Sequence, residues 1–73
     1  MNTKEQFLID SIIDDVSTYL INDNGLTIIE ALDIVYNSQF YEKLSDLKTG
    51  LYYQSSAYNY ELLKQELKYG KVA

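Results

Sequence analysis

The chain contains no proline, and its only three glycines, Gly25, Gly50 and Gly70, each stand where an apolar pattern at helical spacing stops. Glycine commonly follows the last residue of a helix because it adopts the left-handed backbone conformation without strain. Proline, the residue that most often breaks a helix, is missing altogether. The sequence therefore predicts an all-α domain, a small bundle of three to four helices with no sheet.

A single domain over residues 1–73 is predicted to contain four helices, at about 3–22, 27–37, 39–47 and 56–69. A capping residue stands at the start of each. Thr3 and Thr27 begin the pattern of a capping box, in which Ser or Thr is followed three residues later by Glu or Gln. Ser38 is expected to cap the third helix, and Ser55 or Ser56 the fourth.

The first two predicted helices differ in how much of their circumference is apolar. In the first, a wide apolar arc contains Leu8, Ile9, Ile12, Ile13, Val16, Tyr19 and Leu20. Its opposite face contains Asp10, Asp14, Ser17 and Thr18. The second helix has only a narrow polar strip of Glu30, Asp33 and Asn37. Because an almost wholly apolar helix must be covered on most sides, we expect residues 27–37 to form the central helix.

The third predicted helix and the segment behind it are shorter. The helix has an apolar face of Phe40, Tyr41, Leu44 and Leu47. Residues 51–54 have strand propensity, but the sequence offers no second strand to pair with them. We expect this segment to be an extended linker or one helical turn.

The last predicted helix has two separate apolar stripes. One consists of Tyr60, Leu63 and Leu67, and the other of Tyr58, Leu62 and Tyr69. Charged and polar residues, Glu61, Lys64, Gln65 and Lys68, occupy the sector between them. One stripe is expected to face the core. The other faces either solvent or another molecule, or else the first and third helices wrap far enough to cover both.

The composition limits both the source of stability and the chemistry. A chain of 73 residues buries a small core, and such domains usually depend on disulfides, a metal, close helix packing or a partner subunit. With no Cys and no His, disulfides, zinc–thiolate sites and the commonest catalytic base are excluded. We therefore expect no enzyme and no cofactor, and stability from packing and oligomerisation.

The charge is negative and unevenly distributed. Before Tyr41 there are one lysine and seven acidic residues, a net charge of −6. From Tyr41 onward there are five lysines and four acidic residues, a net charge of +1, which together give the total of −5. The chain has no arginine, and an acidic protein repels a polyanion. Direct binding of nucleic acid is not expected.

The apolar residues near the N-terminus do not form a continuous segment. The stretch Phe7, Leu8 and Ile9 ends at Asp10, so no signal peptide is expected. No run of apolar residues approaches the length of a membrane span. The expectations are no membrane association and a cytoplasmic location.

Two acidic positions are weak candidates for a metal site. Asp10 and Asp14 lie four residues apart on one helix face and offer two oxygen ligands, although solvated acids are common there. Residues 22–25 also match the middle of a calcium-binding loop. However, the first and last ligand positions would be Leu20 and Ala31, so a helix C-terminus explains the segment better.

Tyrosines are concentrated in the last third of the chain, with Tyr52, Tyr53, Tyr58 and Tyr60 within nine positions. Stacking platforms for single-stranded nucleic acid need a basic groove, which is missing here. Tyrosine is also favoured in protein interfaces, because it combines a large contact area with a polar tip. The predicted interface residues are Tyr52, Tyr53, Tyr58, Leu62 and Tyr69.

A set of residues over the last two-thirds of the chain forms a recognisable pattern. They are Glu30-Ala31-Leu32, Tyr36-Asn37-Ser38, Tyr41, Leu44, Thr49-Gly50-Leu51-Tyr52, Ser55, Tyr58, Tyr60, Leu63 and Glu66. The pattern resembles a family of short uncharacterised bacterial all-helical proteins of unknown function. Some similar short proteins are encoded near toxin–antitoxin or mobile-element loci. The resemblance implies a shared helical fold and no catalytic residues.

The leading hypothesis is a protein-interaction module. It would form a homodimer through its last helix and act as an accessory or antitoxin-like partner of a neighbouring protein. One alternative is a binder of a divalent metal or small ligand that uses Asp10 and Asp14. Another is an acidic decoy for a nucleic-acid-binding protein, based on the charge of the first half.

Overall fold

A computed structural model describes residues 3–70 of the chain. This part contains α1 (Lys4–Asn24), α2 (Ile28–Tyr36), α3 (Gln39–Ser45), two 3-10 turns η1 (Leu47–Thr49) and η2 (Leu51–Tyr53), and α4 (Ser56–Tyr69). No strand occurs within it, so the prediction of an all-α fold with four helices is confirmed. The expected single turn near residues 51–54 is η2.

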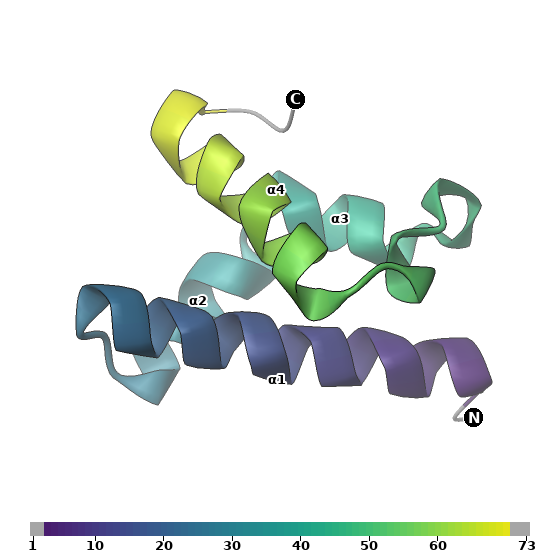
Figure 1. Ribbon diagram of the computed structural model, residues 1–73, viewed down its shortest axis with the longest axis horizontal. Coiled ribbons are helices and arrows are strands. Elements are labelled where there is room, and N and C mark those ends of the chain that lie inside the picture. The colour runs from purple at the N-terminus through teal and green to yellow at the C-terminus, as the bar shows by residue number, and fades with distance from the viewer. Residues whose placement is uncertain (1–2, 71–73) are drawn as a thin grey trace.

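The long helix α1 is the scaffold on which the other elements pack. Figure 1 shows α1 along one side of the molecule, with α2 behind it and α3 and α4 above it. α1 contacts α2 most extensively, then α4 and η2. The last turns of α4 rise away from α1 at the end of the chain. α1, and not residues 27–37, is therefore the element that contacts most of the others.

The expectation that residues 27–37 form the central helix is wrong. α2 buries only Ala31 and Val35, whereas Ile28, Ile29 and Tyr36 are exposed. A helix of nine residues packs along one narrow face, while the 21 residues of α1 present a face to each neighbour. The apolar excess of α2 is therefore directed outward.

The core forms where α1, α2, α3, η2 and α4 meet. Its buried apolar residues are Ile9, Ile12, Ile13, Val16, Leu20, Ala31, Val35, Phe40, Leu44, Leu51, Tyr60 and Leu63. Ser17, placed by its sequence pattern on the polar face of α1, is buried and its hydroxyl oxygen has no hydrogen-bond partner. The elements packed on α1 therefore cover more of its surface than its apolar arc alone.

The predicted caps are largely confirmed. The hydroxyls of Thr3, Thr27, Ser38 and Ser55 each accept a backbone N–H at the start of their helix. Only Thr27 forms the reciprocal capping box. At Thr3 the Gln6 side chain instead donates to Asp10, 2.9 Å away. All three glycines have positive φ and stand behind a helix or 3-10 turn.

A long-range contact joins α4 to the start of α3. The Glu66 carboxylate accepts the backbone N–H groups of Gln39 at 2.9 Å and Phe40 at 2.8 Å, one with each oxygen. The Ser38 hydroxyl accepts the next N–H, that of Tyr41, at 3.0 Å. A carboxylate at a helix N-terminus is favourable because it satisfies free N–H groups and opposes the helix dipole. Glu66 therefore fixes one side of α4 against α3.

We expect Glu66→Gln to lower the free energy of unfolding by about 1–2 kcal/mol, because two charge-assisted hydrogen bonds become at most one neutral bond. The control is Asp14→Asn, whose carboxylate is exposed in the middle of α1, and which should cost less than about 0.5 kcal/mol. Urea unfolding followed by circular dichroism, at one protein concentration, measures both. Equal midpoints for the two variants would show that the Glu66 contact does not hold the fold.

Candidate interaction surfaces

The predicted interface residues on α4 form one outward stripe. Tyr58 is 50% exposed and Tyr69 is 66% exposed, while Leu62 between them is half-buried against the core. The alternative in which the first and third helices cover both stripes does not describe this structure. We call Tyr58, Leu62 and Tyr69 the α4 stripe.

The other stripe of α4 faces inward for most of its length. Tyr60 and Leu63 are buried in the core, as expected. Leu67 is exposed, because the last turns of α4 extend beyond α1. Core packing therefore holds α4 only at its beginning and middle, and the Glu66 contact to α3 holds it further along.

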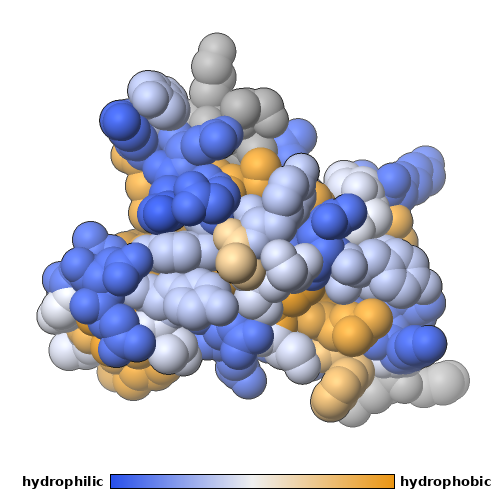
Figure 2. Space-filling model, in the orientation of Figure 1, coloured by the Kyte–Doolittle hydropathy of each residue, from blue (hydrophilic) through white to orange (hydrophobic). Residues whose placement is uncertain are grey.

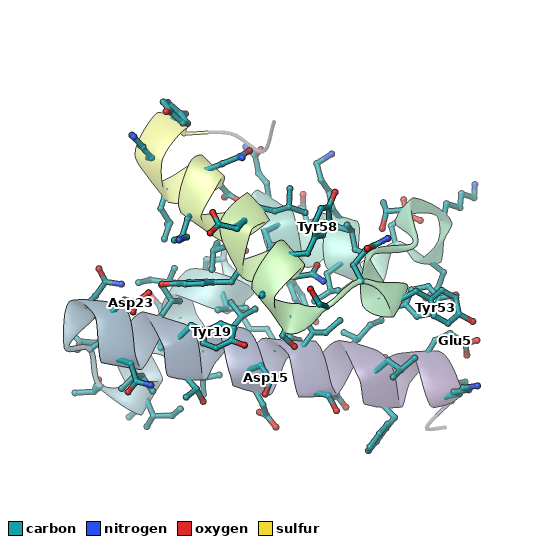
Figure 3. The ribbon with its side chains drawn as sticks, viewed as in Figure 1. Glu5, Asp15, Tyr19, Asp23, Tyr53 and Tyr58 are labelled. Carbon is teal, nitrogen blue, oxygen red and sulfur yellow. The ribbon has the colours of Figure 1, made fainter. Side chains whose placement is uncertain are left out.

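The structure separates Tyr52 and Tyr53 from the α4 stripe. Both belong to η2, which packs on α1. In Figure 3, Tyr53 lies beside Glu5 at the N-terminal end of α1, away from Tyr58 on α4. The Tyr52 and Tyr53 rings contact each other, with centroids 4.3 Å apart. Burial, with smaller contributions from Tyr53 and Glu5, raises the pKa of Tyr52. The five predicted residues therefore form two surfaces.

One edge of the α4 stripe carries both charge signs. Glu61 and Lys68 lie two helical turns apart along this edge. Glu61 pairs with Lys64 of the next turn at 2.9 Å. Lys68 lies over the ring of Tyr69, 5.3 Å from its centroid, and within residues 3–70 it has no carboxylate at ion-pair distance. Figure 2 shows hydrophilic residues over the visible side of α4.

Tyr60 holds α4 against the end of α1. Its ring packs against Tyr19 with centroids 5.1 Å apart, and its hydroxyl donates to the Asp23 carboxylate at 2.7 Å. Burial, together with the bond to Asp23, raises the pKa of Tyr60 to about 12. The hydroxyl therefore remains a protonated donor at neutral pH and serves to position the helix.

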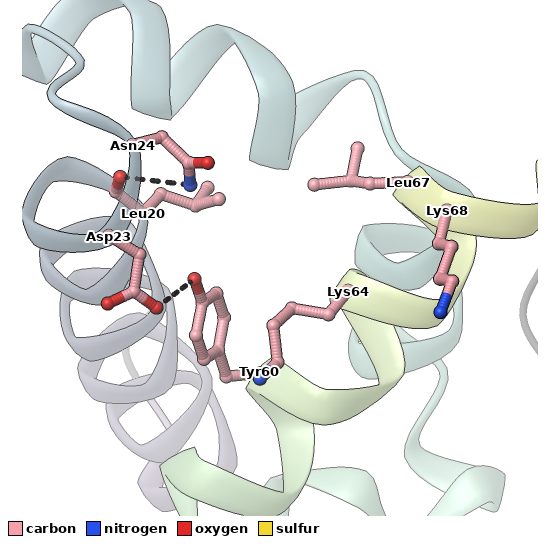
Figure 4. A pocket seen from close by; sticks show the side chains of 7 residues that line it. All are labelled: Leu20, Asp23, Asn24, Tyr60, Lys64, Leu67 and Lys68. Carbon is pink, nitrogen blue, oxygen red and sulfur yellow. Dashed lines mark hydrogen bonds between the residues drawn. The ribbon is translucent and has the colours of Figure 1, made fainter.

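An open groove of about 380 Å³ lies beside this contact, between the ends of α1 and α4 (Figure 4). It is lined by Leu20, Asp23, Asn24, Tyr60, Lys64, Leu67 and Lys68. The Asp23 carboxylate accepts from Tyr60, and the amide of Asn24 donates to the Leu20 carbonyl. These hydrogen bonds fix the walls of the groove.

The candidate metal residues lie on the outer side of α1. Asp10 and Asp14 are both exposed, and Asp10 accepts from the Gln6 side chain. Within residues 3–70, no group of three or more acidic residues could hold a metal ion. Residues 22–25, which match the middle of a calcium-binding loop, form the C-terminal end of α1, as expected. There the Gly25 N–H donates to the Ile21 carbonyl at 2.9 Å.

The sequence analysis missed the outer face of α2. Ile29 is 76% exposed, Ile28 and Tyr36 are also exposed, and Leu32 is half-buried. The Tyr36 ring contacts the Tyr41 ring edge-on, with centroids 5.0 Å apart, so this surface continues onto α3. The sequence of α2 has more apolar residues than one narrow packed face can bury. Such an excess fits an exposed apolar face as well as burial on all sides.

No protein-family model, curated protein or solved structure matches this chain. Its function is therefore inferred from its own residues. Within residues 3–70, no helix combines the length and the apolar character that a bilayer span requires.

The raised pKa of Tyr60 predicts a pH dependence of stability. Since the pKa is about 12 in the folded protein and about 10 in the unfolded chain, the stabilisation is complete below pH 10 and is lost as the pH rises from 10 to 12. Tyr60→Phe should lower the free energy of unfolding by about 1 kcal/mol at pH 7. Its difference from the wild type should shrink and then change sign between pH 10 and pH 12, because a pKa of about 12 instead of about 10 corresponds to roughly 2–3 kcal/mol.

Urea unfolding at each pH gives this difference, with Tyr36→Phe as the control because Tyr36 is exposed. A difference between wild type and Tyr60→Phe that stays constant from pH 7 to pH 12 would contradict the assignment.

Proposed function

We propose that this protein is a protein-interaction module that self-associates through the α4 stripe. The supporting observation is that Tyr58 and Tyr69 are exposed on one face of α4, while Tyr60 on the opposite face and Glu66 along one edge of the α4 stripe hold the helix in place. Exposed aromatic and aliphatic side chains on a rigid element are typical of protein interfaces. A domain this small also gains stability from a partner subunit.

The charges favour an antiparallel pair of α4 helices. In an antiparallel pair related by a two-fold axis, an edge of one stripe meets the same edge of the other, so Glu61 faces Lys68 of the second copy, twice. In a parallel pair this edge would meet the opposite edge, where Glu66 holds α3, and neither ion pair would form. Lys68, which lacks a carboxylate partner among residues 3–70, gains one in the antiparallel dimer.

The wider role that we propose is that of a cytoplasmic bacterial homodimer acting as an accessory or antitoxin-like partner of a neighbouring protein. The family resemblance supports this role by analogy. The alternative of metal or small-ligand binding gains no supporting observation, because Asp10 and Asp14 are solvated and have no third ligand within residues 3–70. The alternative of an acidic decoy rests on the charge of the first half alone.

The dimer is tested by light scattering at micromolar concentration. The wild type should have twice the chain mass of 8.5 kDa, and Tyr69→Glu and Leu62→Glu should each reduce it to one chain, because a charge would be buried in the contact. Leu67→Glu is the matched control, since it is an exposed leucine on another side of α4. Circular dichroism checks that each variant is folded. A wild type of one chain mass overturns the proposal.

The antiparallel geometry is tested by charge exchange. Glu61→Lys and Lys68→Glu should each weaken dimerisation by about tenfold, because each replaces two attractive pairs with two repulsive ones. The double variant should regain most of the wild-type affinity, because both pairs are restored with their signs reversed. Sedimentation at low ionic strength gives the dissociation constants. If the two single variants and the double variant all have the dissociation constant of the wild type, the antiparallel geometry is contradicted. Such a result would not contradict self-association itself.

A further inference from the structure

The outer face of α2 is a second exposed apolar surface, distinct from the α4 stripe. It consists of Ile28, Ile29, Leu32 and Tyr36, of which Ile29 is the most exposed large apolar residue within residues 3–70. α2 packs on α1 and, to a smaller extent, on α3. In Figure 2, hydrophobic surface emerges beneath the turn that joins α1 to α2. This face has no role in the proposed dimer.

The charges of α2 are all negative. Glu30 and Asp33 are both exposed, and the helix contains no lysine. The Thr27 backbone N–H donates to Glu30 at 2.9 Å and lowers the pKa of that carboxyl, and the Asn37 side chain donates to Asp33 at 3.0 Å. Both carboxylates are therefore fixed in position beside the apolar residues.

This charge pattern distinguishes the occupant of the α2 face from that of the α4 stripe. Two copies of α2 packed antiparallel would bring their acidic edges together, and in neither orientation does a residue of α2 offer a positive charge to pair with Glu30 or Asp33. A second copy of this chain is therefore disfavoured here. The remaining requirement is an apolar partner surface with cations at its edges.

We propose that the α2 face binds an amphipathic helix of a different protein, with an apolar face flanked by lysine or arginine. Such a helix places apolar residues three and four positions apart against Ile29, Leu32 and Tyr36. Its cations then lie near Glu30 and Asp33, which accelerates association and selects against acidic helices. The chain thus has one surface for its own copy and another for a basic partner.

The apolar contact is tested with two synthetic amphipathic helices that share a leucine face and differ in having lysine or glutamate flanks. Fluorescence anisotropy at physiological salt should show binding of the lysine peptide at micromolar concentration and binding of the glutamate peptide at least about tenfold weaker. Ile29→Asn should weaken binding of the lysine peptide by about tenfold. Phe7→Asn is the matched control, because Phe7 is 68% exposed on α1, and it should bind like the wild type.

The charge contribution is tested with two variants of equal net charge. Asp33→Lys should weaken binding of the lysine peptide about tenfold, whereas Glu5→Lys, at the far end of α1 (Figure 3), should change it less than about twofold. Equal losses of affinity in Asp33→Lys and Glu5→Lys, or in Ile29→Asn and Phe7→Asn, would show that the lysine peptide binds non-specifically. Either result would overturn the proposal. Ile29→Asn should keep the dimer mass; its dissociation would show a second copy on this face and also overturn the proposal.

Discussion

The carboxylate of Glu66 accepts the first two backbone N–H groups of α3, and the orientation of α4 depends on this contact. The later turns of α4 extend beyond α1, so Leu67 is exposed and contributes little to the core. Tyr60 fixes the beginning of the helix to Asp23, and Glu66 fixes it further along. Tyr60 lies on the face opposite the α4 stripe and Glu66 lies along one of its edges, so the two contacts together keep Tyr58 and Tyr69 exposed. The proposed interface is therefore a consequence of how polar side chains anchor an otherwise lightly packed helix.

The local features of the fold could be predicted from the sequence because each depends on residues within one turn. Thr27 and Glu30 bond each other's backbone across three positions, and Gly25 adopts positive φ directly behind its helix. Features that depend on tertiary packing could not be predicted. Whether the apolar excess of α2 is buried depends on how much of it α1 can cover, and Glu66 meets its partners 26 and 27 residues away. Ser17 is buried for the same reason, since packing encloses it whatever its polarity.

The candidate site was predicted in part. Helical spacing correctly separated Tyr58, Leu62 and Tyr69 from the inward residues Tyr60 and Leu63, although it could not show that η2 places Tyr52 and Tyr53 elsewhere. The α2 face could not be predicted because an apolar pattern does not distinguish a buried helix from a helix with an exposed apolar face. What distinguishes the two exposed surfaces is charge. The α4 stripe has both signs along one edge and suits a second copy, whereas α2 has only acids and suits a basic partner.

The most direct measurement of the central claim is disulfide cross-linking between single cysteines, which is free of background because the chain has no native cysteine. In the antiparallel dimer Gln65 lies close to the two-fold axis, so Gln65→Cys should form a covalent dimer with itself on mild oxidation. Tyr58→Cys and Tyr69→Cys should each form no covalent dimer alone and should cross-link to each other when mixed. Self-cross-linking at all three positions would indicate a parallel pair. No cross-linking at any of them would contradict self-association through α4.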